Sequence, residues 1–230
     1  MKTAGIIGGL GPESTIDYYR SIIALYRQKL GDHYPPLIII SLDVDKGLRL
    51  LGANDLQQLA EYFAGAFRQL AAAGADFGLI SANTPHVVFD EVQRRSPIPL
   101  ISIVEATCDE VKRRGLNKVS LLGTRYTMSG RFYPAVFEKH GLRIMAPTAE
   151  EQADIHDRYV NQLIKGIFLP ETRARLQEII ARQVERDAVQ AVILAGTELP
   201  LILKDETIAG VPLLDTTQIH VNTIVGEILS

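Results

Sequence analysis

The sequence contains very little cysteine: Cys108 is the single thiol among 230 residues. One thiol cannot form an internal disulfide, which argues against a secreted, disulfide-stabilised protein and favours a reducing cytoplasm. It also excludes a zinc or iron–sulfur site built on several thiolates, so we expect no bound metal.

The sequence also lacks long apolar runs and an excess of charge of either sign. No stretch approaches the roughly 18 apolar residues of a membrane span, and the N-terminal apolar segment is too short for a signal peptide. A net charge of −3 and a pI near 6.0 provide no general attraction to nucleic acids or anionic membranes. With 47% hydrophobic and 22% charged residues, the composition is that of a folded globular protein.

Short apolar runs alternate with longer segments of helical periodicity, which predicts an α/β fold with parallel sheets. Strands are expected at 4–8, 36–42, 77–81, 98–102, 118–122, 142–146, 190–195 and 210–214. Helices are expected at 13–30, 54–74 (with Asn54 as its N-cap), 85–95, 104–114, 127–140, 149–166, 170–187 and 216–229.

The chain also repeats itself. Residues 5–14 (GIIGGLGPES) match 120–129 (SLLGTRYTMS), and residues 79–86 (LISANTPH) match 193–200 (ILAGTELP). Gly8 corresponds to Gly123 and Ala82 to Gly196, and these spacings are about half of the chain length. The repeat predicts two pseudo-symmetric α/β domains, 1–97 plus 207–230 and 98–206, with a ligand site in the cleft between them.

Several polar motifs follow predicted strands, where α/β proteins place ligands. The glycines of GGLGPES allow backbone N–H groups to approach an anion, although the same residues also suit a plain strand–helix turn. Asn83 and Thr84 of SANTPH supply an amide and a hydroxyl, and alternatively cap the next helix while His86 packs against it. Thr124, Thr127, Thr197, Glu198, Asp215 and His220 follow other strands in the same way.

Five segments together make the chain resemble the aspartate/glutamate racemase superfamily of pyridoxal-phosphate-independent amino-acid racemases. They are GGLGPESTIDYY, SANTPH, LLGTRYTM, AGTELP and DTTQIH, in this order along the chain. The resemblance implies a cofactor-independent isomerase that binds a small amino acid or dicarboxylate, and a homodimer. It also implies a substrate-binding set of Leu10, Gly11, Asn83, Thr84, Thr124, Thr127, Thr197 and Glu198.

The sequence departs from the family at its reacting centre. The family typically uses two cysteines, one before the Asn-Thr of the first motif and one before the Thr-Glu of the second. These positions hold Ala82 and Gly196, neither of which can carry a proton, and Cys108 lies at neither motif. The two-thiol mechanism is therefore expected to be absent. Replacement acid–base groups are sought among Glu198, Asp45, His86 and His220.

Three functions remain open from the sequence. The first is a racemase-like isomerase of a small acidic or related amino acid that uses replacement groups. The second is a different enzyme on the same scaffold, such as a decarboxylase or a cis–trans isomerase. The third is a non-catalytic amino-acid or dicarboxylate binder, such as a regulatory paralogue. Family resemblance favours an enzyme, whereas the missing thiols favour the binder.

Overall fold

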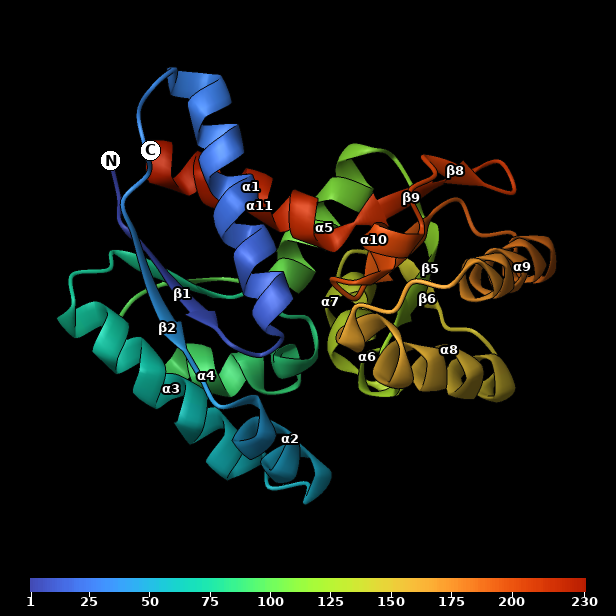
Figure 1. The fold of residues 1–230 in the computed structure, drawn as a ribbon, viewed down its shortest axis with the longest axis horizontal. Helices are drawn as coiled ribbons and strands as arrows, with labels where there is room; N and C mark the ends of the chain where they lie inside the picture. The colour runs from blue at the N-terminus through green and yellow to red at the C-terminus, as the bar shows by residue number, and fades with distance from the viewer. The chain divides into compact units, whose positions relative to one another are not determined.

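The computed structural model describes all 230 residues, and the chain divides into two compact units. The first unit comprises Met1–Ala106 and Thr217–Ser230, and the second comprises Thr107–Thr216. Figure 1 labels the helices and most of the strands of both. Each unit is an α/β structure with a mainly parallel sheet, as the sequence predicted.

Both unit boundaries come later in the chain than the expected ones after residues 97 and 206. The reason is strand pairing: β4 (Leu100–Ile101) is a parallel neighbour of β3 (Phe77–Ile80), and β9 (Val211–Asp215) is a parallel neighbour of β7 (Val192–Ala195). Each of these late strands therefore completes the sheet that precedes it.

The first unit has four parallel strands in the order β2-β1-β3-β4, where β1 is Ala4–Gly8 and β2 is Leu37–Ser41. Its helices are α1 (Pro12–Leu30), α2 (Val44–Gly52), α3 (Leu56–Ala72), the 3-10 turn η1 (Thr84–Val88), α4 (Phe89–Arg95) and α11 (Thr216–Leu229).

Helices cover both faces of this sheet, because successive strand residues point to opposite sides. Ile7 and Ile80 pack in one apolar cluster with residues of α3 and α4. Their neighbours Ile6 and Leu79 pack in another with residues of α1 and α11. The fully apolar strands of the sequence are explained by this double coverage.

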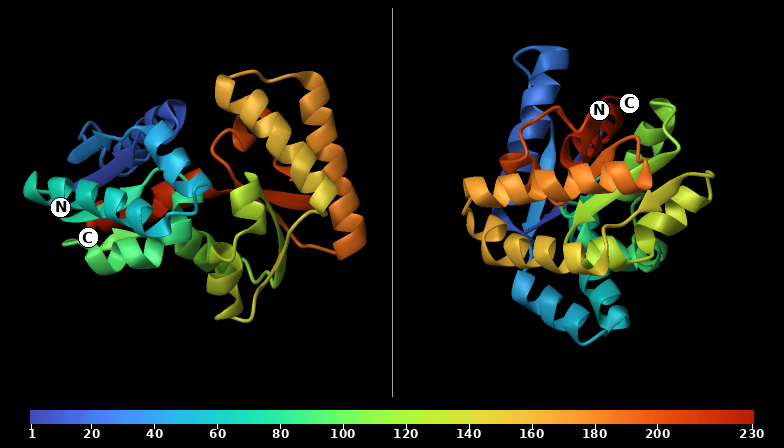
Figure 2. Two further views of the ribbon diagram at one scale, coloured as in Figure 1. Left: turned by 90° about the horizontal axis from the view of Figure 1, so that it is seen from below. Right: turned by 90° about the vertical axis from the view of Figure 1, so that its right-hand side faces the viewer.

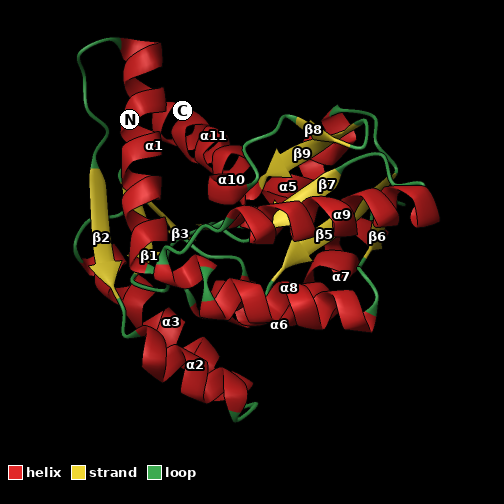
Figure 3. Ribbon diagram, turned by 45° about the vertical axis from the view of Figure 1, so that its right-hand side comes forward, coloured by secondary structure: helices red, strands yellow, loops and turns green.

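The second unit has the strand order β6-β5-β7-β9-β8, where β5 is Lys118–Gly123 and β6 is Arg143–Met145. The short edge strand β8 (Thr207–Ile208) is antiparallel to β9. The helices, drawn red in Figure 3, are α5 (Ile103–Arg113), α6 (Arg125–Ser129), α7 (Phe132–Glu138), α8 (Ala149–Asn161), the turn η2 (Leu163–Lys165), α9 (Pro170–Asp187) and α10 (Leu199–Ile202).

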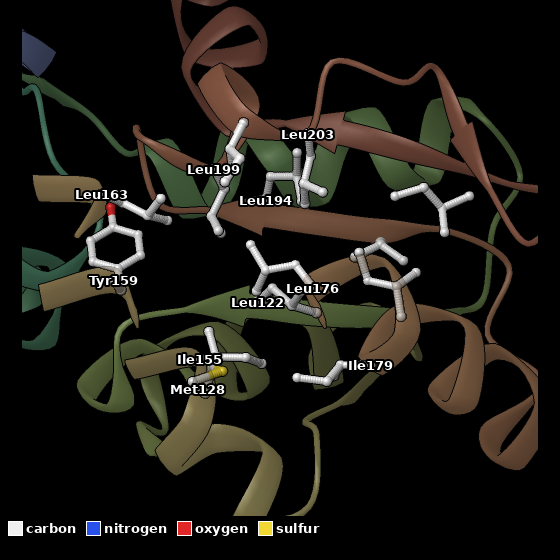
Figure 4. Packing of buried hydrophobic residues seen from close by; sticks show 14 residues of the cluster. Leu122, Met128, Ile155, Tyr159, Leu163, Leu176, Ile179, Leu194, Leu199 and Leu203 are labelled. Carbon is white, nitrogen blue, oxygen red and sulfur yellow. The ribbon is translucent and has the colours of Figure 1, made fainter. Parts of the chain in front are cut away.

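Helices α8 and α9 run side by side in the second unit (Figure 2). Ile155 and Tyr159 of α8 and Leu176 of α9 belong to one buried cluster with Leu122 and Leu194 of the central strands (Figure 4). Helix α8 is thereby held close to the central strands.

The internal repeat is present in three dimensions. Leaving aside β8, both sheets share one strand order, with β1 matching β5 and β3 matching β7. Ile7 pairs with Ile80 in the first unit, and Leu122 pairs with Leu194 in the second. Equivalent loops therefore leave both sheets at equivalent places.

Each sheet is followed by a helix most of which belongs to the other unit. Helix α5 follows β4, yet the chain from Thr107 onward is part of the second unit. Helix α11 follows β9, yet from Thr217 it is part of the first, where Val221 and Ile224 are buried.

The eight expected strands are confirmed. The structure adds α2, α10 and β8, of which α10 and β8 are too short to show a clear period. The expected helix 85–95 is η1 followed by α4, and 127–140 is α6 followed by α7. The expected cap Asn54 was wrong. Asp55 caps α3 by accepting a hydrogen bond from the Gln58 amide at 3.0 Å, while Asn54 has a φ of 55°.

Gly78 in β3 packs against Phe67 of α3, and a larger residue at this position should destabilise the protein. A Cβ added there would lie 2.5 Å from Cε1 of Phe67 and 2.9 Å from Cδ2 of Leu100. We expect Gly78→Ala to lower the free energy of unfolding by about 1–3 kcal/mol, measured by urea denaturation. Gly65→Ala in α3 is the control, because its Cβ meets nothing closer than 3.6 Å and alanine favours the helix. Equal stability of the Gly78 variant and the parent would contradict this packing.

Candidate active site

In the first unit, the GGLGPES and SANTPH segments lie side by side at the carboxyl ends of β1 and β3. The Ser14 hydroxyl donates to the Ser81 carbonyl oxygen at 2.7 Å. Leu10 and Ala82 are partly buried against the same apolar cluster. Gly9 has a φ of 80°, and a Cβ there would lie 2.4 Å from the Leu42 carbonyl oxygen. Glycine is thus required where this loop passes the end of β2.

Asn83 and Thr84 open η1 beside this loop. Asn83 is buried, and its side chain makes no capping hydrogen bond to the turn that follows. Thr84 is partly buried. Gly11, at the N-cap of α1, is also partly buried and has a φ of 146°. These residues therefore share one edge of the first sheet, as the sequence predicted.

His86 is a buried structural link between the Ala82 loop and α5. Its Nε2 accepts from the Ile103 amide at 3.3 Å, so the proton is on Nδ1, which faces the Ala82 carbonyl oxygen at 3.1 Å. The ring also stacks on Phe89, with centroids 4.8 Å apart. Burial lowers the pKa of His86 to about 4, so the ring is neutral at neutral pH.

His220 on α11 is held in the same way. The Tyr18 hydroxyl lies 2.9 Å from Nδ1, and Nε2 lies 3.2 Å from the Ile101 carbonyl oxygen. The carbonyl can only accept, so Nε2 carries the proton and Nδ1 accepts from Tyr18. Burial lowers the pKa of His220 to about 3, with a smaller effect from His86. Both ring nitrogens of both histidines thus face partners within the protein.

Asp45 lies on the solvent-exposed first turn of α2. Its backbone amide donates to the N-cap residue Asp43 at 2.9 Å. The structure brings Asp45 into no hydrogen bond or ion pair with the other predicted site residues.

In the second unit, Thr124 and Thr127 follow β5 at the edge equivalent to the GGLGPES loop. Thr124 is the N-cap of α6 and accepts from the Thr127 amide at 3.3 Å, and the two hydroxyl oxygens lie 3.2 Å apart. The neighbouring Arg125 amide donates to Nδ1 of His156 at 3.3 Å. Helix α8 therefore reaches the same edge as these threonines.

Gly196 follows β7, and the ring of Tyr159 from α8 fills the space beside it. A Cβ built on Gly196 would lie 2.6 Å from Cε2, 2.7 Å from the hydroxyl oxygen and 2.9 Å from Cζ of Tyr159. The φ of Gly196 is not positive, so the backbone conformation does not require glycine. The lack of space requires glycine, because Tyr159 is only 4% exposed and its ring cannot turn into solvent without opening the core.

Tyr159 and Thr197 both bind the buried carboxylate of Glu198. The Tyr159 hydroxyl donates a short hydrogen bond to Oε2, and the Thr197 hydroxyl donates to the same oxygen at 2.9 Å. Burial, and next the Glu198 charge, raise the pKa of Tyr159 well above its usual range. The Tyr159 phenol is therefore the donor. Both hydrogen bonds, from Tyr159 and from Thr197, go to Oε2 of Glu198 and neither goes to its Oε1.

No motif in the sequence points to Tyr159 or His156. Both lie on α8, three residues apart and therefore on one helix face, far in sequence from any motif. Nothing in a helical apolar pattern distinguishes Tyr159 from an ordinary core residue, and Figure 4 shows it at the edge of the buried cluster.

Other features at the strand ends are structural. Asp215 pairs with Leu194 in the β7–β9 ladder, and the Thr216 hydroxyl donates to the Leu194 carbonyl oxygen at 2.9 Å. Cys108 is a buried thiol on α5 that forms no disulfide. No three His, Cys, Asp or Glu side chains converge as a metal site would require, and no helix combines the length and apolar character of a membrane span.

Comparison with known proteins decides the family. The sequence profile of the Asp/Glu/hydantoin racemase family matches residues 7–224. The chain belongs to this family. The broad specificity amino-acid racemase RacX of Bacillus subtilis (strain 168) is 26% identical over 236 residues, covering 98% of each chain.

Solved structures of family members share the whole fold. A crystal structure described as an Asp/Glu racemase from Yersinia pestis has a TM-score of 0.93 and 34% identity, covering 100% of both chains. That of an aspartate racemase homologue from Pyrococcus horikoshii OT3 has a TM-score of 0.88 and 33% identity, also covering 100% of both chains. The family resemblance and the two-sheet fold expected from the motifs are confirmed.

The two buried histidines predict how stability depends on pH. In the unfolded chain histidine titrates near its ordinary pKa of about 6.5, so below that pH the unfolded state binds more protons than the native state. The contribution of the two neutral histidines to the free energy of unfolding should be fully present above about pH 6.5. It should fall toward pH 4, by up to about 1.4 kcal/mol per pH unit for each histidine. We expect His220→Gln to flatten this slope in urea denaturation at several pH values. The exposed His33 supplies the control, His33→Gln, which should leave the slope unchanged; an unchanged slope in the His220 variant would refute the assignment.

The contact between Gly196 and Tyr159 predicts energetic coupling. Gly196→Ala should lower the free energy of unfolding by about 1–3 kcal/mol because the new methyl group meets the phenol ring. In a Tyr159→Leu background, which lacks the ring atoms that the methyl group meets, the same change should cost less. We expect the cost to fall by at least about 1 kcal/mol. A double-mutant cycle in urea measures this difference. Equal costs in the two backgrounds would show that Tyr159 does not fill the position.

Proposed function

We propose that this chain is a racemase-like isomerase of a small acidic or related amino acid that transfers the α-proton without a cofactor and without two thiols. The observation that supports this function is the equivalent placement of amide, hydroxyl and carboxylate groups after the central strands of both units. Asn83 and Thr84 follow β3, Thr124 follows β5, and Thr197 and Glu198 follow β7.

These groups suit the two charged groups shared by all amino acids. In the first unit, the Asn83 amide and the Thr84 hydroxyl suit hydrogen bonding to a carboxylate, assisted by backbone N–H groups of the glycine loop at Leu10 and Gly11. In the second unit, the Thr124 hydroxyl supplies the same kind of donor. Thr127 supports Thr124 through the contact of their hydroxyl groups. Glu198, with Thr197 on its Oε2, is the acceptor for the ammonium group or the α-proton.

Racemisation needs a base to remove the weakly acidic α-proton and an acid to return one to the opposite face. Ala82 and Gly196 supply neither. Among the replacement groups, Glu198 is favoured because it is a buried carboxylate directly after β7. His86 and His220 are disfavoured as proton carriers by partners at both ring nitrogens, and Asp45 by its exposure on α2.

The names of the relatives support an acidic amino acid as the substrate class. The Bacillus subtilis relative is named a broad specificity amino-acid racemase, and the Yersinia pestis and Pyrococcus horikoshii structures are named for aspartate and glutamate racemases. An acidic amino acid is therefore the first ligand to test, with neutral amino acids next.

A second candidate, a non-catalytic binder of an amino acid or dicarboxylate, is favoured by the side chains at positions 82 and 196, which cannot carry protons. Proton exchange separates the two. The protein is incubated with L- and D-aspartate and glutamate in D₂O, and loss of the α-proton signal is followed by NMR. Exchange supports the isomerase, whereas saturable binding without exchange supports the binder. No binding of any amino acid would refute both.

We further propose that the chain is a cytoplasmic homodimer. Its single buried thiol suits a reducing compartment, and the homodimer rests on the family resemblance. Light scattering on a size-exclusion column, where a mass of 25.4 kDa would contradict the dimer, tests the assembly.

Binding variants test the ligand groups in each unit. Asn83→Ala and Thr124→Val should each weaken amino-acid binding roughly ten-fold or more in calorimetry, because each removes a hydrogen-bonding group. The controls are Asn222→Ala, an exposed amide on α11, and Thr148→Val, which also removes a helix N-cap threonine. Thr148→Val should destabilise the protein about as much as Thr124→Val without affecting binding. Weakened binding in both threonine variants would indicate loss of structure instead of loss of a ligand contact.

A further inference from the structure

The side chain that occupies the position of the second family thiol comes from another helix. The hydroxyl oxygen of Tyr159 lies 2.7 Å from the place where a Cβ of residue 196 would be. A cysteine at 196 would carry its sulfur one bond beyond that Cβ, so the phenolic oxygen stands within reach of the same volume. Tyr159 therefore brings an ionisable O–H group to a position where the chain itself supplies only a hydrogen atom.

The phenol is coupled to a base. Its proton points to Oε2 of Glu198, which also accepts from Thr197 at 2.9 Å. Both side chains are buried, Tyr159 at 4% and Glu198 at 7% exposure. A hydrogen bond between an O–H donor and a carboxylate is strong in such surroundings, and it provides a direct path for a proton between the two oxygens.

We propose that Tyr159 and Glu198 together act as the acid–base group that takes the place of the thiol at position 196. This inference rests on the proposed isomerase function. As the phenolic oxygen takes the α-proton of the amino acid, the phenolic proton passes to Oε2 of Glu198. The C–H electron pair stays on the substrate and is delocalised into its carboxyl group. In the reverse step the phenol gives a proton back to the same face of the α-carbon and recovers one from Glu198. The pair thus exchanges the α-proton at that face, and both side chains end as they began.

This arrangement explains why Gly196 is a glycine. Its backbone conformation is open to other residues, but any side chain would collide with the phenol ring. The absence of a thiol at position 196 and the present position of the Tyr159 ring are thus linked, because the two side chains would occupy the same space. Restoring a cysteine at 196 alone should displace Tyr159 and not regain a working site.

Tyr159→Phe tests the proposal, because it keeps the ring and removes the O–H group. We expect α-proton exchange in D₂O to fall about 100-fold or more for the enantiomer whose α-proton faces Tyr159, the magnitude typical of losing an acid–base group. A merely structural role would lower exchange of both enantiomers alike. Glu198→Gln, which preserves shape but cannot take the phenolic proton, should produce the same enantiomer-selective loss.

Tyr133→Phe is the matched control. Tyr133 is another fully buried tyrosine of the second unit, and its hydroxyl bonds to Thr107; neither residue belongs to one of the five motifs. Its variant also loses one buried hydroxyl, but exchange should stay at the parental rate. Urea denaturation of both variants shows whether the two losses cost comparable stability.

The outcomes separate the inference from the function on which it rests. No exchange by the unaltered protein overturns the isomerase function, and the inference with it. Exchange that survives Tyr159→Phe at the parental rate, or that falls equally for both enantiomers, overturns the inference alone. Exchange that is lost selectively in Tyr159→Phe and Glu198→Gln but kept in Tyr133→Phe supports it.

Discussion

Everything at the candidate site depends on the pairing of two central parallel strands in each unit, β1 with β3 and β5 with β7. Because both strands of a pair run in one direction, the loops that follow them leave the sheet at one edge. The paired registers, Ile7 with Ile80 and Leu122 with Leu194, set these loops side by side. A Cβ at Gly123 would lie 2.6 Å from the Ala195 carbonyl oxygen, so close packing of strand ends is part of the same constraint.

The buried polar groups divide by how completely the protein satisfies them. His86 and His220 each use both ring nitrogens on partners within the first unit, which keeps them neutral and holds loops and helices in place. In the second unit, Glu198 receives two hydroxyl donors on a single oxygen. Acid–base chemistry requires a group that can still accept or give a proton. The Glu198 carboxylate, whose two donors share one oxygen, meets this criterion better than the imidazoles, whose two nitrogens both have partners.

Much of this could be predicted from the sequence, for physical reasons. Strands buried on both faces are apolar throughout, and their ends are marked by glycine and polar residues, so the eight main strands and the strand-end motifs were predictable. The elements α10 and β8 are too short to show a period, whereas the nine-residue helix α2 was missed despite its length. The role of Tyr159 was not predictable, because it depends on the packing of α8 against β7. The same holds for His86, whose partner Ile103 lies beyond the next strand.

The placement of α5 and α11 bears on how such a protein arose. If a duplicated ancestral segment had ended with its own helix packed on its own sheet, the present halves would each be self-contained. Instead, from Thr107 and from Thr217 the chain contributes to the unit other than the one whose sheet it has just left. A gene fragment encoding either sequence half would specify a sheet without the helix that now completes it. Neither sequence half therefore contains all of the chain that makes up one unit, and each unit is complete only when both halves are present.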